Sequence, residues 1–162
     1  MKERIVFHID VNNAFLSWTA VYLLKKGYKQ DIRKIPSIIC GDEKERSGIV
    51  LAKSPVAKKF GIVTAETIYS ARKKCPNLEM FPPNYNLYST CSKNLFKYLS
   101  QYSPQIEQYS IDECFLDYTY SVNLFGDPIK IAYKIKDDIY SMFGFTVNVG
   151  VGSNKLLAKM AS

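Results

Sequence analysis

Apolar residues follow two patterns along the chain, short unbroken runs and repeats at helical spacing, and together these predict an α+β protein. The runs lie between Gly, Pro and polar residues, which is typical of strands. They predict strands at 5–9, 36–40, 49–52, 78–81, 106–111, 114–118 and 145–151. The repeats predict helices from Asn12 or Asn13 to Gly27, at 55–60, 65–74, 87–102 and 128–142, and from 153 onward. A polar turn at 41–48 joins the second and third strands.

The order of these elements indicates how they are grouped. When residues 12–83 are set aside, the remaining order is strand, helix, strand, strand, helix, strand, which is that of a ferredoxin-like fold. We therefore expect a ferredoxin-like βαββαβ core with a small α/β lobe inserted after its first strand.

The composition favours a folded protein with a polyanionic partner. Of the 162 residues, 47% are hydrophobic and 23% are charged, which predicts a folded core rather than disorder. The apolar runs are too short to span a bilayer and the first residues lack a signal-peptide pattern, so we expect a cytoplasmic protein with no membrane partner. The net charge of +7 is consistent with nucleic-acid binding, although a genome rich in A and T produces the same surplus of Lys. The four cysteines lack metal-ligand spacing and predict reduced, mostly buried thiols.

Three carboxylates stand at the ends of predicted strands. Asp10 follows the first strand, and Asp112 and Glu113 occupy the tight junction between the strands at 106–111 and 114–118. In a ferredoxin-like sheet the first strand lies beside this hairpin, so the three side chains would meet at one edge. Their repulsion would favour bound cations, and two Mg²⁺ ions at such a site can support nucleotidyl transfer. The alternative is that these acids only cap turns and helices. His8 is expected to be a packed strand residue rather than a ligand.

Four segments form an ordered set of motifs along the chain. They are His8–Phe15, Gly48–Ile62, the Ser-Ile-Asp-Glu hairpin within Tyr109–Asp117, and Val149–Lys159. In this order they resemble the motifs of the Y-family DNA polymerases, which include the DNA polymerase IV and UmuC-like translesion enzymes. The hairpin is the most specific of the four.

The resemblance implies a role for each matched residue. The ligands of two Mg²⁺ ions would be the carboxylates of Asp10, Asp112 and Glu113 with the carbonyl of Val11. The nucleotide-binding residues would be Asn13, Ala14, Phe15, Lys58 and Lys155. Within this set, Phe15 takes the position of the steric gate that excludes a ribose 2′-hydroxyl, and both lysines would contact the triphosphate.

Some positions depart from the family pattern. Pro55 stands where many relatives carry a triphosphate-binding Tyr, and Lys58 stands where they carry Arg. Ala65 and Thr67 replace an expected Gly and Pro. These departures bear on nucleotide affinity and on the subfamily, polymerase IV-like or UmuC-like, rather than on the family.

The resemblance also implies an organisation into domains. Residues 1–11 and 84–162 would form the palm and residues 12–83 the fingers, whereas the family's thumb and little-finger domains have no counterpart in the chain. The implied partners are primer–template DNA and a dNTP, with a sliding clamp reached through a region outside the chain. We expect a fragment of a translesion polymerase that acts in DNA damage tolerance, with weak DNA binding and little activity alone.

Two other functions remain open from the sequence. A nucleotide cyclase also uses a ferredoxin-like fold and paired metals, but its hairpin typically reads Gly-Gly-Asp-Glu-Phe. A nucleic-acid-binding module without catalysis is the second, and the retained carboxylates argue against it.

Overall fold

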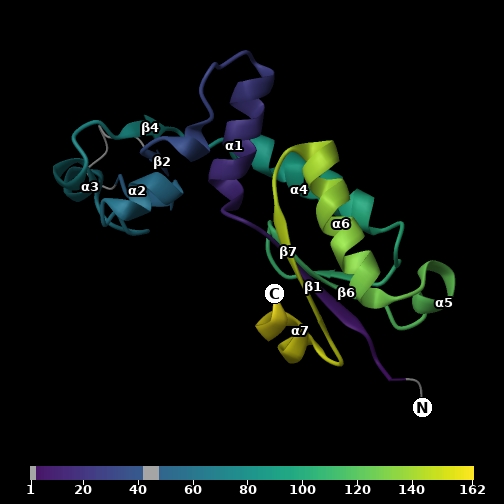
Figure 1. Cartoon of the computed structure of the whole chain (residues 1–162). Helices are drawn as coiled ribbons and strands as arrows, with labels where there is room; N and C mark the ends of the chain where they lie inside the picture. Colours follow the sequence, from purple (N-terminus) through teal and green to yellow (C-terminus); the bar gives the residue numbers. More distant parts are fainter. Residues whose placement is uncertain (1–2, 42–47) are drawn as a thin grey trace. The chain divides into compact units, whose positions relative to one another are not determined.

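The computed structural model describes residues 3–41 and 48–162 (Figure 1). The chain divides into two compact units, one formed by residues 1–12 and 89–162 and the other by residues 13–88. The predicted turn at 41–48 falls largely outside the described residues.

The first unit contains a four-stranded sheet and several helices. Its strands are β1 (Val6–Val11), β5 (Ile106–Gln108), β6 (Glu113–Asp117) and β7 (Val147–Gly152). Its helices are α4 (Tyr85–Leu99, from Ser89 onward), α5 (Val122–Phe125), α6 (Pro128–Phe143) and α7 (Lys155–Ala161).

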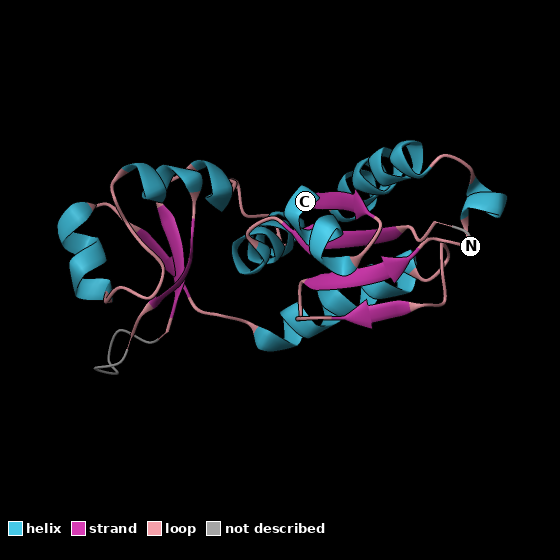
Figure 2. Cartoon of the chain, turned by 90° about the horizontal axis from the view of Figure 1, so that it is seen from below, coloured by secondary structure: helices cyan, strands magenta, loops and turns pink. Residues whose placement is uncertain are grey.

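All neighbouring strands of this sheet are antiparallel, in the order β5-β6-β1-β7 (Figure 2). β1 lies between β6 and β7, and it is buried along almost its whole length because helices cover both faces of the sheet. Helices α4 and α6 lie side by side, where the Tyr98 hydroxyl donates a hydrogen bond to Asp138 at 2.8 Å. Ile135 and Ile139 of α6 are fully buried, as is Phe7 of β1, whose ring stacks on Tyr118 with centroids 4.6 Å apart.

Helix α7 covers the opposite face, and glycine permits its close approach to β7 (Figure 1). Side chains alternate along a strand, so Gly150 and Gly152 point to the same face. A Cβ at Gly150 would lie 2.0 Å from the carbonyl oxygen of Ala158, and one at Gly152 would lie 2.6 Å from the nitrogen of Ala158. The missing side chains therefore let the backbone of α7 rest directly on the strand.

The second unit contains a three-stranded sheet in the order β3-β2-β4, with β2 antiparallel to β3 and parallel to β4. Its elements are α1 (Ala14–Lys25), η1 (Ile32–Lys34), β2 (Ser37–Cys40), β3 (Val50–Lys53), α2 (Pro55–Lys59), α3 (Ile68–Lys74) and β4 (Glu79–Phe81). Ser54 and Thr67 cap α2 and α3 through their side-chain oxygens, and Pro55 occupies the first turn of α2. Two apolar clusters form its core, one around Ile38 and one around Ile39.

Several element boundaries differ from the predicted ones for local reasons. β5 ends at Gln108 rather than 111, because the amides of Tyr109 and Ser110 both turn back to the carbonyl of Glu113. α3 begins at Ile68 rather than 65, because Ala65 adopts φ 69° and Thr67 provides the cap. The short elements η1 and α5 were not predicted. Across the described residues, no helix is long and apolar enough to cross a membrane.

Candidate active site

The three predicted carboxylates lie together at one end of the first unit's sheet. Asp10 of β1 is paired directly with Glu113 of β6. Asp112 adjoins this pair, and its carbonyl oxygen accepts a hydrogen bond from the amide of Val11 at 3.0 Å. Directly opposed residues in antiparallel strands have Cβ atoms about 4.5–5.5 Å apart. Strand register therefore brings together acids that are a hundred residues apart in sequence.

The hairpin that carries Asp112 and Glu113 is fixed by its own turn. The amides of Tyr109 and Ser110 donate to the carbonyl of Glu113 at 2.9 and 3.1 Å. The Ser110 hydroxyl donates to Asp112 Oδ1 at 2.6 Å. The Ser-Ile-Asp-Glu sequence thus contributes a turn, an orienting hydroxyl and two carboxylates within four residues.

The Glu113 carboxylate has two partners that the sequence did not indicate. His8 Nε2 lies 2.7 Å from Glu113 Oε1, and the Lys159 ammonium forms an ion pair with the same oxygen. The His8 side chain is only 2% exposed, and its Nδ1 lies 2.6 Å from the Ser162 hydroxyl. The expectation that His8 is a packed strand residue is therefore incomplete, because it also orients an acid of the site. The sequence spacing could have indicated this role. His8 and Asp10 are two residues apart on one strand, so their side chains lie on the same face of the sheet as the carboxylate site.

The electrostatics of this cluster follow from its burial and charge. The pKa of Asp10 is raised, first by burial and then by the nearby Asp112 and Glu113 carboxylates, whereas His8 and Lys159 oppose the shift. Burial alone would raise the pKa of Glu113, but the hydrogen bonds from Lys159 and His8 lower it below its usual value. The carboxylates therefore repel one another, and cations of the chain partly offset the repulsion.

The donor set suits a hard divalent cation, although its side chains are engaged within the chain. Carboxylate oxygens are the ligands that Mg²⁺ prefers. Within residues 3–41 and 48–162, no group of three His, Cys, Asp or Glu side chains is already arranged around a metal position. In this structure Glu113 contacts His8 and Lys159, and Asp112 accepts a hydrogen bond from the Ser110 hydroxyl.

Four of the predicted nucleotide-binding residues belong to the second unit. Asn13 and Ala14 begin α1, and Asn13 has φ 50° with its amide donating to the carbonyl of Lys53 at 2.8 Å, so its side chain does not cap the helix. The Phe15 ring stacks on Tyr88 with centroids 4.5 Å apart and planes 6° from parallel. A hollow of about 330 Å³ is lined by Lys53, Lys58 and Asn13, among others.

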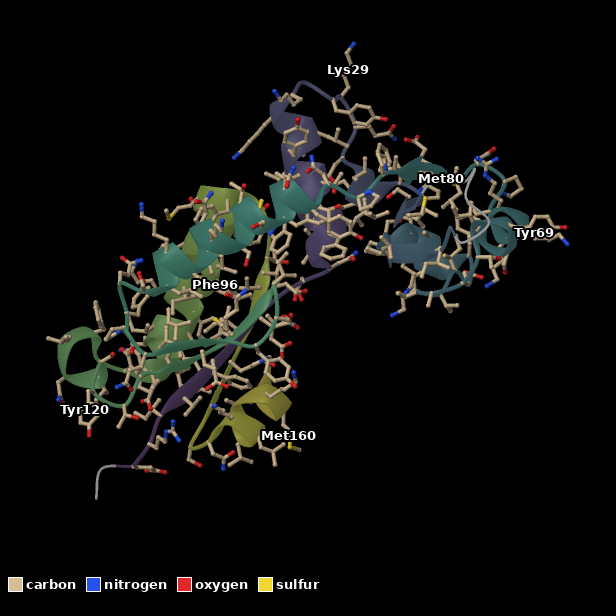
Figure 3. All side chains as sticks on the ribbon, turned by 180° about the vertical axis from the view of Figure 1, so that it is seen from behind. Lys29, Tyr69, Met80, Phe96, Tyr120 and Met160 are labelled. Carbon is tan, nitrogen blue, oxygen red and sulfur yellow. The ribbon has the colours of Figure 1, made fainter. Side chains whose placement is uncertain are left out.

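The fifth, Lys155, lies on α7 in the first unit. Its ammonium forms an ion pair with Glu107 of β5 and lies 5.7 Å from the centroid of the Phe115 ring. Lys159 is one turn further along the helix, whereas the neighbouring Met160 points to solvent and is 74% exposed (Figure 3).

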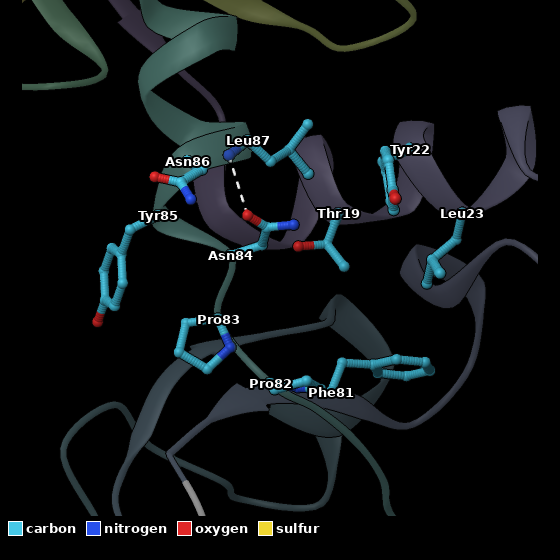
Figure 4. Close-up of a pocket in the computed structure, with 10 residues that line it drawn as sticks. All are labelled: Thr19, Tyr22, Leu23, Phe81, Pro82, Pro83, Asn84, Tyr85, Asn86 and Leu87. Atoms are coloured by element: carbon cyan, nitrogen blue, oxygen red, sulfur yellow. Dashed lines mark hydrogen bonds between the residues drawn. The ribbon is translucent and has the colours of Figure 1, made fainter.

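A larger hollow of about 430 Å³ lies within the second unit, between α1 and residues 81–87 (Figure 4). Thr19, Asn84 and Asn86 are among its polar lining residues, and the amide of Leu87 donates to Asn84 Oδ1. None of its described lining residues is charged.

Comparison with known proteins identifies the family of this site. The sequence profile of the impB/mucB/samB family matches residues 9–162, which include all three carboxylates. The chain belongs to the impB/mucB/samB family. The resemblance to Y-family polymerases drawn from the four motifs is thereby confirmed.

The sequences of relatives in this family align with nearly the whole of this chain. The DNA polymerase IV of Clostridium acetobutylicum is 55% identical over 160 residues, which are 99% of this chain and 40% of that protein. The DNA polymerase IV of Acetivibrio thermocellus is 39% identical over 160 residues, covering 99% of this chain and 39% of the relative. The chain thus spans about 40% of the length of the curated relatives it matches.

Solved structures of similar proteins share the fold. The Y-family DNA polymerase chimera Dbh-Dpo4(243-245)-Dbh superposes with a TM-score of 0.84 and 31% identity, covering 96% of this chain and 44% of the chimera. A structure described as the insertion ternary complex of Dbh DNA polymerase superposes with a TM-score of 0.82 and 30% identity. The match again covers 96% of this chain and 44% of the other.

Proposed function

We propose that this chain carries the catalytic centre of a translesion DNA polymerase, which adds deoxynucleotides to a primer 3′ end on template DNA. The observation that carries the proposal is the pairing of Asp10 with Glu113 across β1 and β6, with Asp112 adjoining, in a chain whose curated relatives are named DNA polymerase IV. Because the chain spans about 40% of those relatives, the activity is proposed for the full-length protein. A sliding clamp remains a predicted partner of that protein.

We assign residues 1–11 and 84–162 to the palm and residues 12–83 to the fingers. The division into two compact units near these positions supports the assignment. The strand order β5-β6-β1-β7 supports a ferredoxin-like palm, since the first strand then lies between the hairpin and the last strand.

Two Mg²⁺ ions are the proposed cofactors, held by the carboxylates of Asp10, Asp112 and Glu113 and by the carbonyl of Val11. When bound, they would activate the primer hydroxyl and stabilise the negative charge on the departing pyrophosphate. The pKa of Asp10 is raised first by burial and then by repulsion from Asp112 and Glu113, and this repulsion supports the assignment because bound cations would relieve it.

The incoming dNTP is assigned to the second unit together with Lys155. The Phe15 ring is fixed by its stack on Tyr88, which suits a steric gate that must stay in place against the sugar. Lys58, with the amides of Asn13 and Ala14, is assigned to the triphosphate. Lys155, whose ammonium forms an ion pair with Glu107, is assigned to the same group.

Primer extension by the full-length protein tests the carboxylates. Asp112→Ala and Glu113→Ala should each reduce dNTP addition nearly to background, because each removes a proposed metal ligand. Asp137→Ala is a matched control, since this acid is exposed on α6 and outside the cluster. Near-normal extension by either site variant, with an unchanged circular dichroism melt, would refute the assignment.

A second assay tests the gate. Phe15→Ala in the full-length protein should raise incorporation of rNTPs relative to dNTPs, because the ring no longer excludes the 2′-hydroxyl. Tyr85→Ala removes a neighbouring exposed aromatic that touches Phe15 only edge-on, and it should leave sugar selection largely intact. Equal rNTP exclusion by wild type and Phe15→Ala would remove Phe15 from this role. The chain of residues 1–162 alone is expected to bind DNA weakly and extend primers little.

A further inference from the structure

The Glu113 carboxylate is already paired with a cation that belongs to the chain. The Lys159 ammonium forms an ion pair with Glu113 Oε1, and it also lies 4.4 Å from the centroid of the Tyr109 ring. Carboxylate and aromatic face therefore hold the ammonium from two sides. The side chain of Lys159 is 46% exposed, against 15% for Glu113, so the lysine has room to move whereas the acid has little.

The same oxygen of Glu113 also faces His8 Nε2 at 2.7 Å. A divalent cation at this carboxylate would meet the positive charge of Lys159 at contact range, where like charges repel strongly in a partly buried site. Lys is a compact charge on a flexible four-carbon stem, so it can swing away while the buried His8 remains in place.

We propose that Lys159 is an internal counter-ion of the carboxylate site, which a divalent cation displaces from Glu113, so that Lys159 weakens metal binding. The inference rests on the proposed function, since it assumes that the three carboxylates bind metal. It predicts that the affinity of the carboxylates for a divalent cation is set partly by residue 159.

The test is Mn²⁺ binding to the purified chain without DNA or nucleotide, followed by the electron paramagnetic resonance signal of free Mn²⁺. Lys159→Met should bind Mn²⁺ about two- to fivefold more tightly, which is the range expected from losing a partly exposed ion pair. Lys159→Arg keeps the charge and should bind Mn²⁺ as wild type does. Should Lys159→Met fail to give the wild-type circular dichroism spectrum, Lys159→Gln replaces it.

Lys134→Met is the matched control, because it removes the same charge from the same unit but breaks an ion pair with Asp138 on α6 instead. Its Mn²⁺ affinity should stay at the wild-type value. Unchanged or weaker binding by Lys159→Met, or equal tightening by both variants, would overturn the proposal.

Asp112→Asn separates this inference from the proposed function. Weaker Mn²⁺ binding by Asp112→Asn, together with no change in Lys159→Met, refutes only the counter-ion. Wild-type Mn²⁺ affinity in Asp112→Asn refutes the metal site itself, and the counter-ion with it.

Discussion

Helix α7 lies so close to β7 that the strand has no room for a single methyl group at Gly150. A Cβ there would lie 2.0 Å from the carbonyl oxygen of Ala158 and 2.5 Å from the amide nitrogen of Ser162, whereas ordinary contact begins at 3.4 Å. Both obstructing atoms are backbone, so no side-chain rotation relieves the overlap. In Gly150→Ala the helix must therefore move away from the sheet by about 1 Å or more.

The expected cost has two parts. Overpacking that forces a backbone shift typically costs about 1–3 kcal/mol, and loss of the Lys159–Glu113 ion pair adds at most about 1 kcal/mol. We expect Gly150→Ala to lower the free energy of unfolding by about 2–3 kcal/mol in a urea titration followed by circular dichroism. Amide hydrogen exchange should quicken most at residues 155–161.

Gly41→Ala provides the control, because the nearest atom among the described residues, the Cα of Gly48, lies 3.9 Å from its added Cβ. That variant should change the free energy of unfolding by less than about 0.5 kcal/mol. Gly152→Ala should lower the free energy of unfolding as Gly150→Ala does, because a Cβ at Gly152 would lie 2.6 Å from the backbone nitrogen of Ala158. If Gly150→Ala unfolds at the wild-type urea concentration with unchanged exchange in α7, the close packing of helix on strand is wrong.

Three further substitutions test the second unit. Tyr88→Phe should lower the free energy of unfolding by about 1 kcal/mol in a urea titration, because it removes the buried hydrogen bond between the Tyr88 hydroxyl and Thr19 Oγ1 at 3.0 Å. Asp31→Asn keeps the cap acceptor but loses the charge beside Arg33, whose hydrogen bonds lower the pKa of Asp31. The free energy of unfolding of the wild type should therefore exceed that of the variant by about 0.5 kcal/mol at pH 7. In urea titrations at several pH values, this difference should vanish as the pH falls below about 4 and Asp31 becomes protonated. Ala65→Gly should raise the melting temperature, because φ 69° strains an alanine by about 1 kcal/mol.

Local sequence signals were sufficient to predict the carboxylate pair and its hairpin. An apolar run that leads into Asp10 predicts a strand, which in the structure continues through Asp10 to Val11. The Ser-Ile-Asp-Glu segment encodes its own turn through backbone and hydroxyl contacts between neighbouring residues. Each signal spans only a few residues, so it can be recognised from the sequence without knowledge of the tertiary structure. The left-handed backbone at Ala65 was not predicted, because the position departs from the Gly of the family pattern.

The partners of Glu113 could not be predicted in this way, because they depend on how far α7 is displaced along the sheet. Lys155 and Lys159 are four residues apart, so both face the sheet, and the sequence motif favoured Lys155 for a functional role. Which lysine reaches the carboxylates depends on the level at which the helix crosses the strands.

Strand register determines that level. Residues at one level across the four strands form a row that consists of Gly150, His8, Phe115 and Glu107. The next row toward the hairpin contains Asn148, Asp10 and Glu113. Because α7 rests on the glycine of the first row, Lys155 reaches only the acid in that row, and one helical turn carries Lys159 to the acid of the next. Two glycines at alternate positions of one strand, followed by two lysines one turn apart on the next helix, therefore place a cation on the Glu113 carboxylate.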